Sequence, residues 1–300
     1  MSRLSELRMN PVPLGTQANA LSIDVECWHQ IICRKLTARS IPPMEQCYHM
    51  TRSVLSLLKE VKVTATFFVL GTVAARFPEL VRQIDRDGHE VATHGYSHTP
   101  ITGLSRDDFR LEIRRSADVL TDIIGKPVIG FRAPEFSVVE TTLWALDILA
   151  ELGIKYDSSI FPIRGNRYGI AAFPTGAVRM ALRNGPLIEI PPSAIRMWGR
   201  SLPVAGGGYF RILPLGWIVR AIHRINREGR PFVLYLHPYE LSEAPLRCDD
   251  FPVRPKKFAS LITEMRWNVL RSTIRDKLGR LLKEFRFAAI HEVLGDALRT

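Results

Sequence analysis

The stretch Ala20-Leu-Ser-Ile-Asp-Val-Glu26 is a mainly apolar run that ends in two carboxylates, and its composition predicts a buried strand. A second run, Val63-Thr-Ala-Thr-Phe-Phe-Val-Leu70, is rich in β-branched and aromatic residues and predicts another buried strand. Residues 51–59 have helical spacing, and residues 78–87 begin with proline and are followed by glycine, as helices often are. Strands that alternate with helices at this spacing favour a parallel α/β architecture.

The same alternation continues along most of the chain. Further strands are predicted at residues 90–93, 128–131, 154–156, 187–190, 231–237 and 285–290. Further helices are predicted at residues 105–124, 141–152 and 213–228, in a long basic region at 258–285, and at the end of the chain. Residues 161–185 are rich in Gly and Arg and predict no regular element. Because no internal repeat or flexible linker is visible, we expect a single domain with a C-terminal extension.

The composition is that of an ordinary globular protein. Of the 300 residues, 46% are hydrophobic and 24% are charged, which excludes a disordered, collagen-like or low-complexity chain. The longest apolar run without a charge, residues 63–75, is shorter than the roughly 20 residues that a membrane span needs. The first 15 residues lack the apolar centre of a signal peptide, and the four cysteines fit no common zinc spacing. We therefore expect reduced thiols and a cytoplasmic location.

The net charge of +11 is concentrated in one segment. Residues 254–286 contain ten basic and three acidic residues, so this segment alone carries +7. The ordinary interpretation is a solvated helix face. A second interpretation is placement of the protein at the periphery of the inner membrane, against an anionic surface or a lipid-linked glycan. Since no nucleic-acid recognition motif accompanies the charge, we expect no nucleic-acid partner.

Polar residues follow several of the predicted strands directly. In parallel α/β folds the carboxyl ends of the strands meet at one edge, where the chemistry collects. Residues in such positions are therefore expected to form one site. They are Asp24, Glu26, His94, His98, Arg132, Asp157 and His237.

The pattern His94-Gly-Tyr-Ser-His98 places two imidazoles four residues apart. On a helical turn these two rings would share a face and could reach one metal ion. Asp24 and Glu26 point the same way if residues 20–26 form a strand, because side chains alternate along a strand. Two histidines and one carboxylate are typical of a catalytic metal site with positions open to water, which leaves the second carboxylate free to act as a base.

Five motifs occur in the order found in polysaccharide deacetylases, the NodB-homology enzymes of carbohydrate esterase family four, and the chain resembles that family. The motifs are Ser22-Ile-Asp-Val-Glu26, His94-Gly-Tyr-Ser-His98, Phe131-Arg-Ala-Pro134, Asp157-Ser-Ser159 and Tyr235-Leu-His237. Further stretches are similar to the branch associated with exosortase (PEP-CTERM) exopolysaccharide loci. They are Gly206-Gly-Gly-Tyr-Phe-Arg211, Tyr235-Leu-His-Pro-Tyr-Glu240 and Trp267-Asn-Val-Leu-Arg271.

The resemblance implies a fold and a domain organisation. The expected fold is a distorted (β/α) barrel with a basic helical extension at the C-terminus. Residues 1–18 would form an N-terminal segment and residues 19–300 a single barrel domain. Within that domain, residues 21–240 would hold the catalytic motifs and residues 250–300 the extension.

The resemblance also implies one divalent metal ion, with zinc expected and cobalt, nickel or manganese as alternatives. Glu26, His94 and His98 would be its ligands. Asp24 would be the general base, and Arg132 would orient it and keep it charged. Here Val25 stands where the family has a second aspartate, so the opposite assignment, with Asp24 as the ligand, stays open.

The remaining roles concern the leaving group and the substrate. His237 would protonate the departing amine, since the pKa of histidine lies near neutral pH. The backbone N–H of Glu135, just after Pro134, would bind the oxyanion. Asp157, Tyr209 and Arg211 would lie on the oxyanion and substrate side, and Gly206-Gly-Gly208 would form a mobile loop there. The family's fourth-motif aspartate aligns with Ile160, so the carboxylate expected to tune His237 is missing.

Three functions follow from these features. The first is a metal-dependent hydrolase that removes N-acetyl groups from an N-acetylhexosamine polysaccharide or its precursor. The second is a hydrolase of a small non-sugar amide. The third is a barrel without catalytic activity that binds carbohydrate, which the altered first and fourth motifs would favour.

Overall fold

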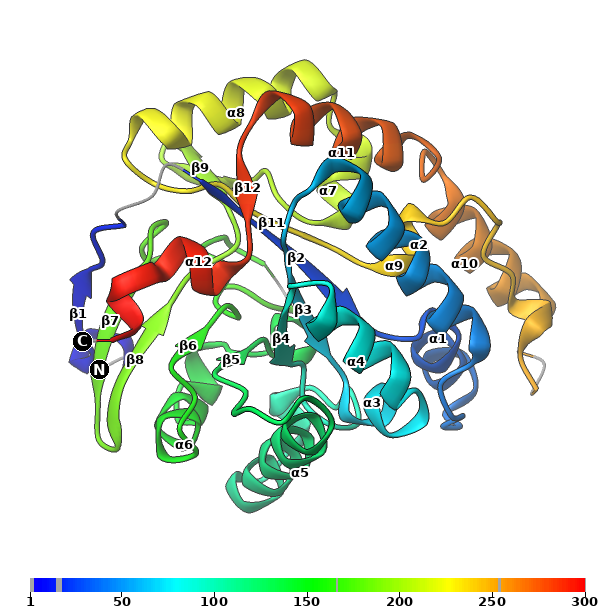
Figure 1. Ribbon diagram of the computed structural model, residues 1–300, viewed down its shortest axis with the longest axis horizontal. Helices are drawn as coiled ribbons and strands as arrows, with labels where there is room; N and C mark the ends of the chain where they lie inside the picture. The colour runs from blue at the N-terminus through cyan, green and yellow to red at the C-terminus, as the bar shows by residue number, and fades with distance from the viewer. Residues whose placement is uncertain (1–2, 15–17, 166, 253–254, 300) are drawn as a thin grey trace.

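A computed structural model describes residues 3–14, 18–165, 167–252 and 255–299. Its main sheet runs in the order β1-β7-β8-β6-β5-β4-β3-β2-β11, with β12 beside β2 (Figure 1). The strands of this sheet are β1 (Arg8–Pro11), β2 (Asn19–Val25), β3 (Thr66–Val69), β4 (Glu90–Thr93), β5 (Gly130–Phe131), β6 (Tyr156–Asp157), β7 (Val178–Leu182), β8 (Gly185–Glu189), β11 (Val233–Leu236) and β12 (Phe287–Ala288).

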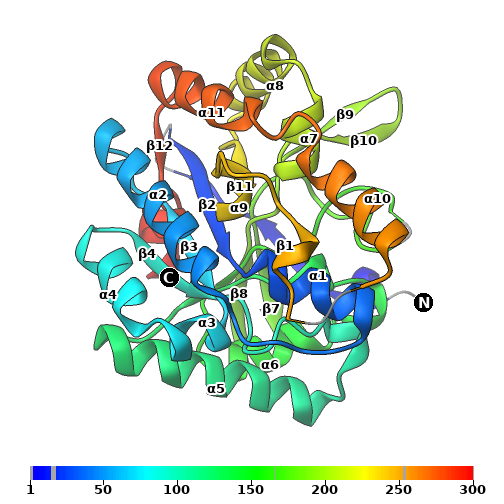
Figure 2. The ribbon, with the colours of Figure 1, turned by 90° about the vertical axis from the view of Figure 1, so that its right-hand side faces the viewer.

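The strands from β8 through β2 to β11 are parallel, and β1 and β7 extend one edge in antiparallel fashion. Helices lie around the outside of these strands, as Figures 1 and 2 show. The predicted α/β barrel architecture is thus confirmed. The barrel stays open, because among the described residues no pairing joins the edge strands β1 and β11.

The helices are α1 (Trp28–Thr37), α2 (Glu45–Val61), α3 (Gly71–Arg76), α4 (Pro78–Arg86), α5 (Arg106–Ile124), α6 (Ala145–Glu151), α7 (Gly207–Ile212), α8 (Leu215–Arg227), α9 (Pro238–Leu241), α10 (Lys257–Asn268), α11 (Thr273–Glu284) and α12 (Ile290–Leu294). The predicted start of α5 is confirmed, since the Ser105 side chain accepts a hydrogen bond from the Asp108 backbone N–H. None of the described helices combines the length and apolar composition that crossing a bilayer requires.

Strand β2 lies between β3 and the edge strand β11 in the parallel sheet, and all seven of its residues are buried. Leu21, Ile23 and Val25 pack into the apolar layer shared with the surrounding helices. Ser22 and Asp24 alternate with them and are also buried, with hydrogen bonds to groups on neighbouring strands. The alternation thus directs polar groups into the barrel, toward the end where β2 stops.

Several elements differ from the sequence predictions. The basic helical region predicted at residues 258–285 consists of two helices, α10 and α11, separated by a turn in which Leu270 has φ of 55°. The irregular region at 161–185 contains β7, which pairs with both β1 and β8. The prediction missed β1, α1, α7 and the hairpin of β9 (Ala194–Met197) and β10 (Arg200–Pro203). These elements are mostly short, which leaves too few residues for a period to show.

Residues 1–18, predicted to precede the domain, contribute β1 to the main sheet. Residues 1–2 and 15–17 of that segment, and residues 253–254 near the start of the basic segment, lie outside the described residues. All four cysteines are buried and free.

Candidate active site

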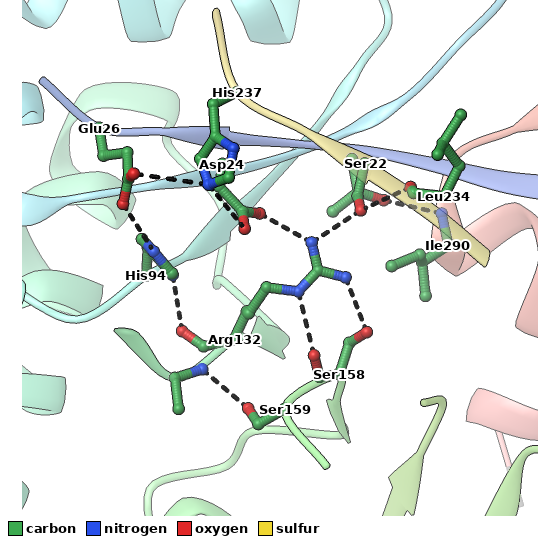
Figure 3. Close-up of polar contacts among 12 residues, drawn as sticks. Ser22, Asp24, Glu26, His94, Arg132, Ser158, Ser159, Leu234, His237 and Ile290 are labelled. Atoms are coloured by element: carbon green, nitrogen blue, oxygen red, sulfur yellow. Dashed lines mark hydrogen bonds and ion pairs between the residues drawn. The ribbon is translucent and has the colours of Figure 1, made fainter. Parts of the chain in front are cut away.

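Six of the predicted site residues come together at the carboxyl ends of the parallel strands, five of which Figure 3 labels. They are Asp24 near the end of β2, Glu26 just after β2, His94 and His98 after β4, Arg132 after β5 and His237 after β11. All are buried except His237, whose side chain is 16% exposed.

Glu26, His94 and His98 form a buried group whose ligand atoms lie within 4.8 Å of one another. Glu26 Oε2 is 2.6 Å from His98 Nε2 and 3.5 Å from His94 Nε2. Burial by itself would raise the pKa of Glu26, but the neighbouring imidazoles of His98, His237 and His94 hold it well below its usual value. Burial lowers the pKa of His98, which favours the neutral form that can ligate a metal. This donor set fits a divalent transition-metal ion.

The backbone fixes the ring of His94. Its Nδ1 lies 2.8 Å from the carbonyl oxygen of Arg132, and a carbonyl can only accept, so Nδ1 carries the proton. The lone pair of Nε2 is then free to face Glu26.

The two histidines were predicted to lie on a helical turn, but in the structure they lie on a loop. His94 ends β4, and the following loop has Gly95 at φ of 78° and His98 at φ of 59°. The loop therefore doubles back and brings the rings to 5.4 Å between centroids. The four-residue spacing correctly predicted that the two rings lie close together. The predicted backbone conformation was wrong, because the segment is a loop and not a helix.

Two charged side chains hold this loop from opposite sides. Arg34 of α1 donates to the carbonyl oxygens of Ser97 at 3.2 Å and His98 at 2.7 Å. Glu112 of α5 accepts from the backbone N–H groups of Tyr96 at 3.2 Å and Ser97 at 2.9 Å. No sequence motif singled out Arg34 or Glu112, because their role depends on how two helices pack.

Arg132 is fully buried and its guanidinium makes four hydrogen bonds to its neighbours (Figure 3). It donates to Asp24 Oδ1 and Ser22 Oγ, both at 2.7 Å, and to the Ser158 carbonyl at 3.0 Å and Ser158 Oγ at 2.8 Å. Its carbon Cζ lies 4.2 Å from the centroid of the Phe68 ring. The carboxylate of Asp24 is thus held by a fixed, buried cation.

His237 faces both carboxylates from the end of β11, the strand next to β2. Its Nε2 is 3.4 Å from Glu26 Oε1 and 3.9 Å from Asp24 Oδ2. Tyr239, whose ring stacks on His237 at 4.8 Å between centroids, donates from its hydroxyl to Glu26 at 2.8 Å. Burial opposes the charged form of His237, but Glu26 and Glu240 outweigh it and raise its pKa to about 9.

The carboxylate that the fourth motif lacks is supplied three residues after His237. Glu240 Oε2 lies 2.9 Å from His237 Nδ1 and also accepts from the His237 backbone N–H at 3.0 Å. The sequence left open which group tunes His237, and Glu240 occupies that position. The signal was present in the sequence, since a glutamate at the third position of a short helix can reach back to its N-cap.

Glu135 and Pro134 lie beside this group in a strained turn. Glu135 has φ of 56° and Phe136 has φ of 53°, a conformation that residues other than glycine seldom adopt. Within the described part of the chain, nothing accepts a hydrogen bond from the Glu135 backbone N–H. The Glu135 side chain points to Lys35, whose Nζ is 2.8 Å from Oε1.

Asp157 lies behind the site. Its carboxylate is fully buried, accepts from Ser159 Oγ and faces the carboxylate of Glu189 on β8. Ser159 Oγ in turn accepts from the Ala133 backbone N–H at 2.7 Å, so this group supports the turn that contains Pro134. Burial raises the pKa of both acids, that of Asp157 to about 6, because two charged carboxylates are disfavoured in a buried site.

The structure does not place Tyr209 and Arg211 beside the group formed by Glu26, His94 and His98. Tyr209 joins an aromatic cluster in which its hydroxyl is 3.3 Å from that of Tyr168. Arg211 is turned toward α10 and donates to the carbonyl oxygen of Trp267 at 2.8 Å.

The glycine run 206–208 is also packed rather than mobile at its first two positions. A Cβ on Gly206 would collide with the Tyr235 ring, and one on Gly207 with the Glu240 carboxylate.

Comparisons with known proteins divide the chain in two. Residues 44–156 match the family described as Polysaccharide deacetylase, and residues 158–295 match a domain of unknown function, DUF3473. The chain is 36% identical over 155 residues to a chitooligosaccharide deacetylase of Rhizobium leguminosarum bv. trifolii, covering 49% of this chain and 69% of that protein.

A peptidoglycan-N-acetylglucosamine deacetylase of Bacillus cereus is 28% identical over 130 residues, 39% of this chain. The match spans 47% of that enzyme's length. A solved structure named as a polysaccharide deacetylase, from Mycobacterium smegmatis, aligns with a TM-score of 0.63 and 21% identity, covering 96% of this chain and 93% of that one. At this identity the structural likeness concerns the fold alone.

Proposed function

Because this chain belongs to the polysaccharide deacetylase family, we propose that it is a metal-dependent hydrolase that removes acetyl groups from N-acetylhexosamine units. The bond broken is an amide, a carbon–nitrogen bond other than a peptide bond. The observation that carries the proposal is the convergence of Glu26, His94 and His98 on one point, with Asp24 and His237 close beside it.

Glu26, His94 and His98 would hold the metal ion, for which zinc is our first choice and cobalt, nickel or manganese are alternatives. A divalent ion bound there would polarise the acetyl carbonyl and acidify a water molecule. The proton on His94 Nδ1 supports this assignment, since it leaves Nε2 as a ligand atom. Asp24 is less suited to be a ligand, because one of its oxygens is committed to Arg132.

Asp24 is the proposed general base. Arg132 fixes Oδ1, and Oδ2 faces the gap that His237 also faces. In that position Asp24 would accept the proton of the attacking water.

His237 is the proposed general acid for the departing amine. Its pKa of about 9 keeps Nε2 protonated at neutral pH, and an amine leaves readily only when it is protonated. The free backbone N–H of Glu135 would donate to the oxyanion that develops on the acetyl group.

We favour a polysaccharide or its precursor because the relatives are named for peptidoglycan and chitooligosaccharide deacetylation. Three further predictions come from the sequence alone. They are membership of the exosortase-associated branch, a cytoplasmic location at the inner membrane and contact with a lipid-linked glycan. The complete set of acid, base and ligand residues speaks against a barrel without catalytic activity.

Acetate release tests the proposal. The full chain, stripped of metal and then reloaded with zinc, is assayed on oligomers of N-acetylglucosamine and on small cyclic amides. We expect acetate from the oligomers only after reloading. Turnover of the small amides alone would establish the alternative hydrolase, and equal inactivity of stripped and loaded protein on all substrates would contradict the proposal.

A further inference from the structure

The exposed apolar side chains of this protein gather on one helix. Six of the nine large hydrophobic side chains that are exposed in the described part of the chain lie in α10 and the turn after it. They are Phe258 (75% exposed), Leu261 (63%), Ile262 (44%), Met265 (63%), Val269 (51%) and Leu270 (51%).

Helix α10 turns its apolar face outward, whereas an ordinary surface helix turns that face toward the core. With about 3.6 residues per turn, Phe258, Leu261, Ile262 and Met265 form one stripe, and that stripe faces outward. The opposite face attaches to the body through polar groups. Glu264 accepts from the Cys248 backbone N–H at 2.6 Å, and Asn268 donates to the Leu246 carbonyl at 2.9 Å. No residue of α10 is buried.

Cations border the apolar stripe on both sides. By the same helical geometry, Lys257 and Arg266 fall on opposite edges of it, and both are exposed. Among the described residues no acidic side chain pairs with either. Other cations of the basic segment instead donate hydrogen bonds to backbone carbonyl groups of the protein. Arg271 donates to the Tyr239 carbonyl at 2.7 Å, and Lys277 to the Arg211 carbonyl at 2.8 Å.

We propose that α10 and the turn after it form a docking surface for an anionic membrane. An outward apolar stripe with lysine and arginine on its edges is the arrangement of helices that lie in the membrane interface, where the stripe enters the acyl boundary and the cations meet lipid phosphates. Helix α10, which carries the stripe, lies at the outside of the molecule in both views (Figures 1 and 2).

The docking surface lies close to the candidate active site. Trp267 of α10 contacts the ring of Tyr239 at 5.6 Å between centroids, and Tyr239 binds Glu26. A membrane held against α10 would therefore lie beside the site, within reach of a glycan carried on a lipid.

Vesicle sedimentation tests this surface without substrate, so its outcome is independent of the proposed enzymatic activity. The full chain is mixed with vesicles of equal parts phosphatidylglycerol and phosphatidylcholine, or of phosphatidylcholine alone. We expect binding only to the anionic vesicles, weaker at high salt. Leu261→Gln with Met265→Gln should weaken it about tenfold or more.

The matched control is Leu111→Gln, which removes an equally exposed apolar side chain (62%) from α5. It should bind as the wild type does. The proposal is overturned if anionic vesicles do not bind, if the double variant binds normally, or if light scattering shows a dimer that the double variant dissociates, because a second copy would then cover the stripe.

A separate observation concerns Glu240, and it rests on the proposed function. We also propose that Glu240 is a positioning residue for His237, held in place by the close approach of Gly207. The Glu240 carboxylate lies against Gly207 so closely that a Cβ there would overlap it. Lys277 fixes the other end of α7 by donating to the carbonyl oxygens of Phe210, Arg211 and Leu213.

The adjacent glycine provides a matched control. A Cβ on Gly208 would meet no atom within 4 Å, whereas a Cβ on Gly207 would displace the Glu240 carboxylate and with it the His237 ring. We expect Gly207→Ala and Glu240→Gln to lower kcat about 10- to 100-fold with little change in KM, as for other residues that orient catalytic groups. Gly208→Ala should match the wild type.

Glu240→Asp in the Gly207→Ala background separates positioning from folding. Aspartate is one methylene shorter and makes room for the methyl group that Gly207→Ala adds, so the double variant should regain part of the lost kcat. Equal kcat values for Gly207→Ala and Gly208→Ala, or an unimpaired Glu240→Gln, would overturn the positioning role. If the wild type itself releases no acetate, it is the proposed function that fails.

Discussion

The two sides of the candidate active site are built in different ways. Glu26, His94 and His98 come from the loops after β2 and β4, and Arg34, Glu112 and Arg132 hold those loops from three other elements. His237, Tyr239 and Glu240 come from a single turn after β11. The first side is held by hydrogen bonds from several different elements. On the second side, the ring of His237 is held by the Glu240 carboxylate. Loss of a supporting residue on the second side should therefore displace a catalytic group more than loss of one supporting residue on the first side.

The largest expected effect is on the ligand side. His94→Ala removes one of the proposed ligands, and we expect acetate release to fall to background while zinc binding, measured by calorimetry, is lost. His49→Ala, on an exposed position of α2, is the control and should retain both. Undiminished zinc affinity in His94→Ala would separate this residue from the metal.

Asp24 and Glu26 should differ in what their loss removes. Asp24→Asn should lower kcat about 10²- to 10⁴-fold, the range for a missing general base, and leave zinc bound. Glu26→Gln should weaken zinc binding first. The two variants are compared by calorimetry and by acetate release. The reverse pattern would assign the metal to Asp24.

Arg132 links both sides through the barrel interior. Arg132→Met leaves Asp24 buried without its cation and should reduce the free energy of unfolding by about 3–5 kcal/mol. Urea unfolding measures this. Adding Asp24→Asn should restore part of the stability, because the unpaired charge is then removed. Additive losses in the double variant would mean that the two residues do not interact.

The smallest effect is expected behind the site. Because burial raises the pKa of Asp157 and Glu189, the folded state holds more protons than the unfolded chain. The free energy of unfolding should therefore fall as the pH rises from about 4, near the unfolded pKa values, through about 6. Asp157→Asn should reduce this fall by at most about 3 kcal/mol, measured by urea unfolding across that range.

Acetate release should be little affected by Asp157→Asn if the residue only supports the turn at Pro134. A large loss of kcat with unchanged stability would move Asp157 into the active site.

The sequence allowed the parallel sheet and the central residues of the site to be predicted, because both rest on local patterns. Apolar runs such as residues 63–70 identify buried strands, and the residues that follow them meet at one edge. Arg34 and Glu112 could not be found, since their role arises only when α1 and α5 pack around the histidine loop. Glu240 could have been found from its spacing to His237.

The basic segment shows the limit of charge counting. Its charges suggested one solvated face, but Arg271 and Lys277 bind backbone carbonyl groups inside the protein. Lys257 and Arg266 instead border an apolar stripe. Net charge carries no information about which of these environments a cation occupies, because that depends on the packing of α10 and α11.

The most direct test of the central claim is a crystal structure of the zinc-loaded protein, with the ion located by anomalous scattering. We expect a single site bonded to Glu26, His94 Nε2 and His98 Nε2, with Asp24 still paired to Arg132 and unbound. An ion bonded to Asp24 with Glu26 turned away, or no ion at this position, would contradict the account.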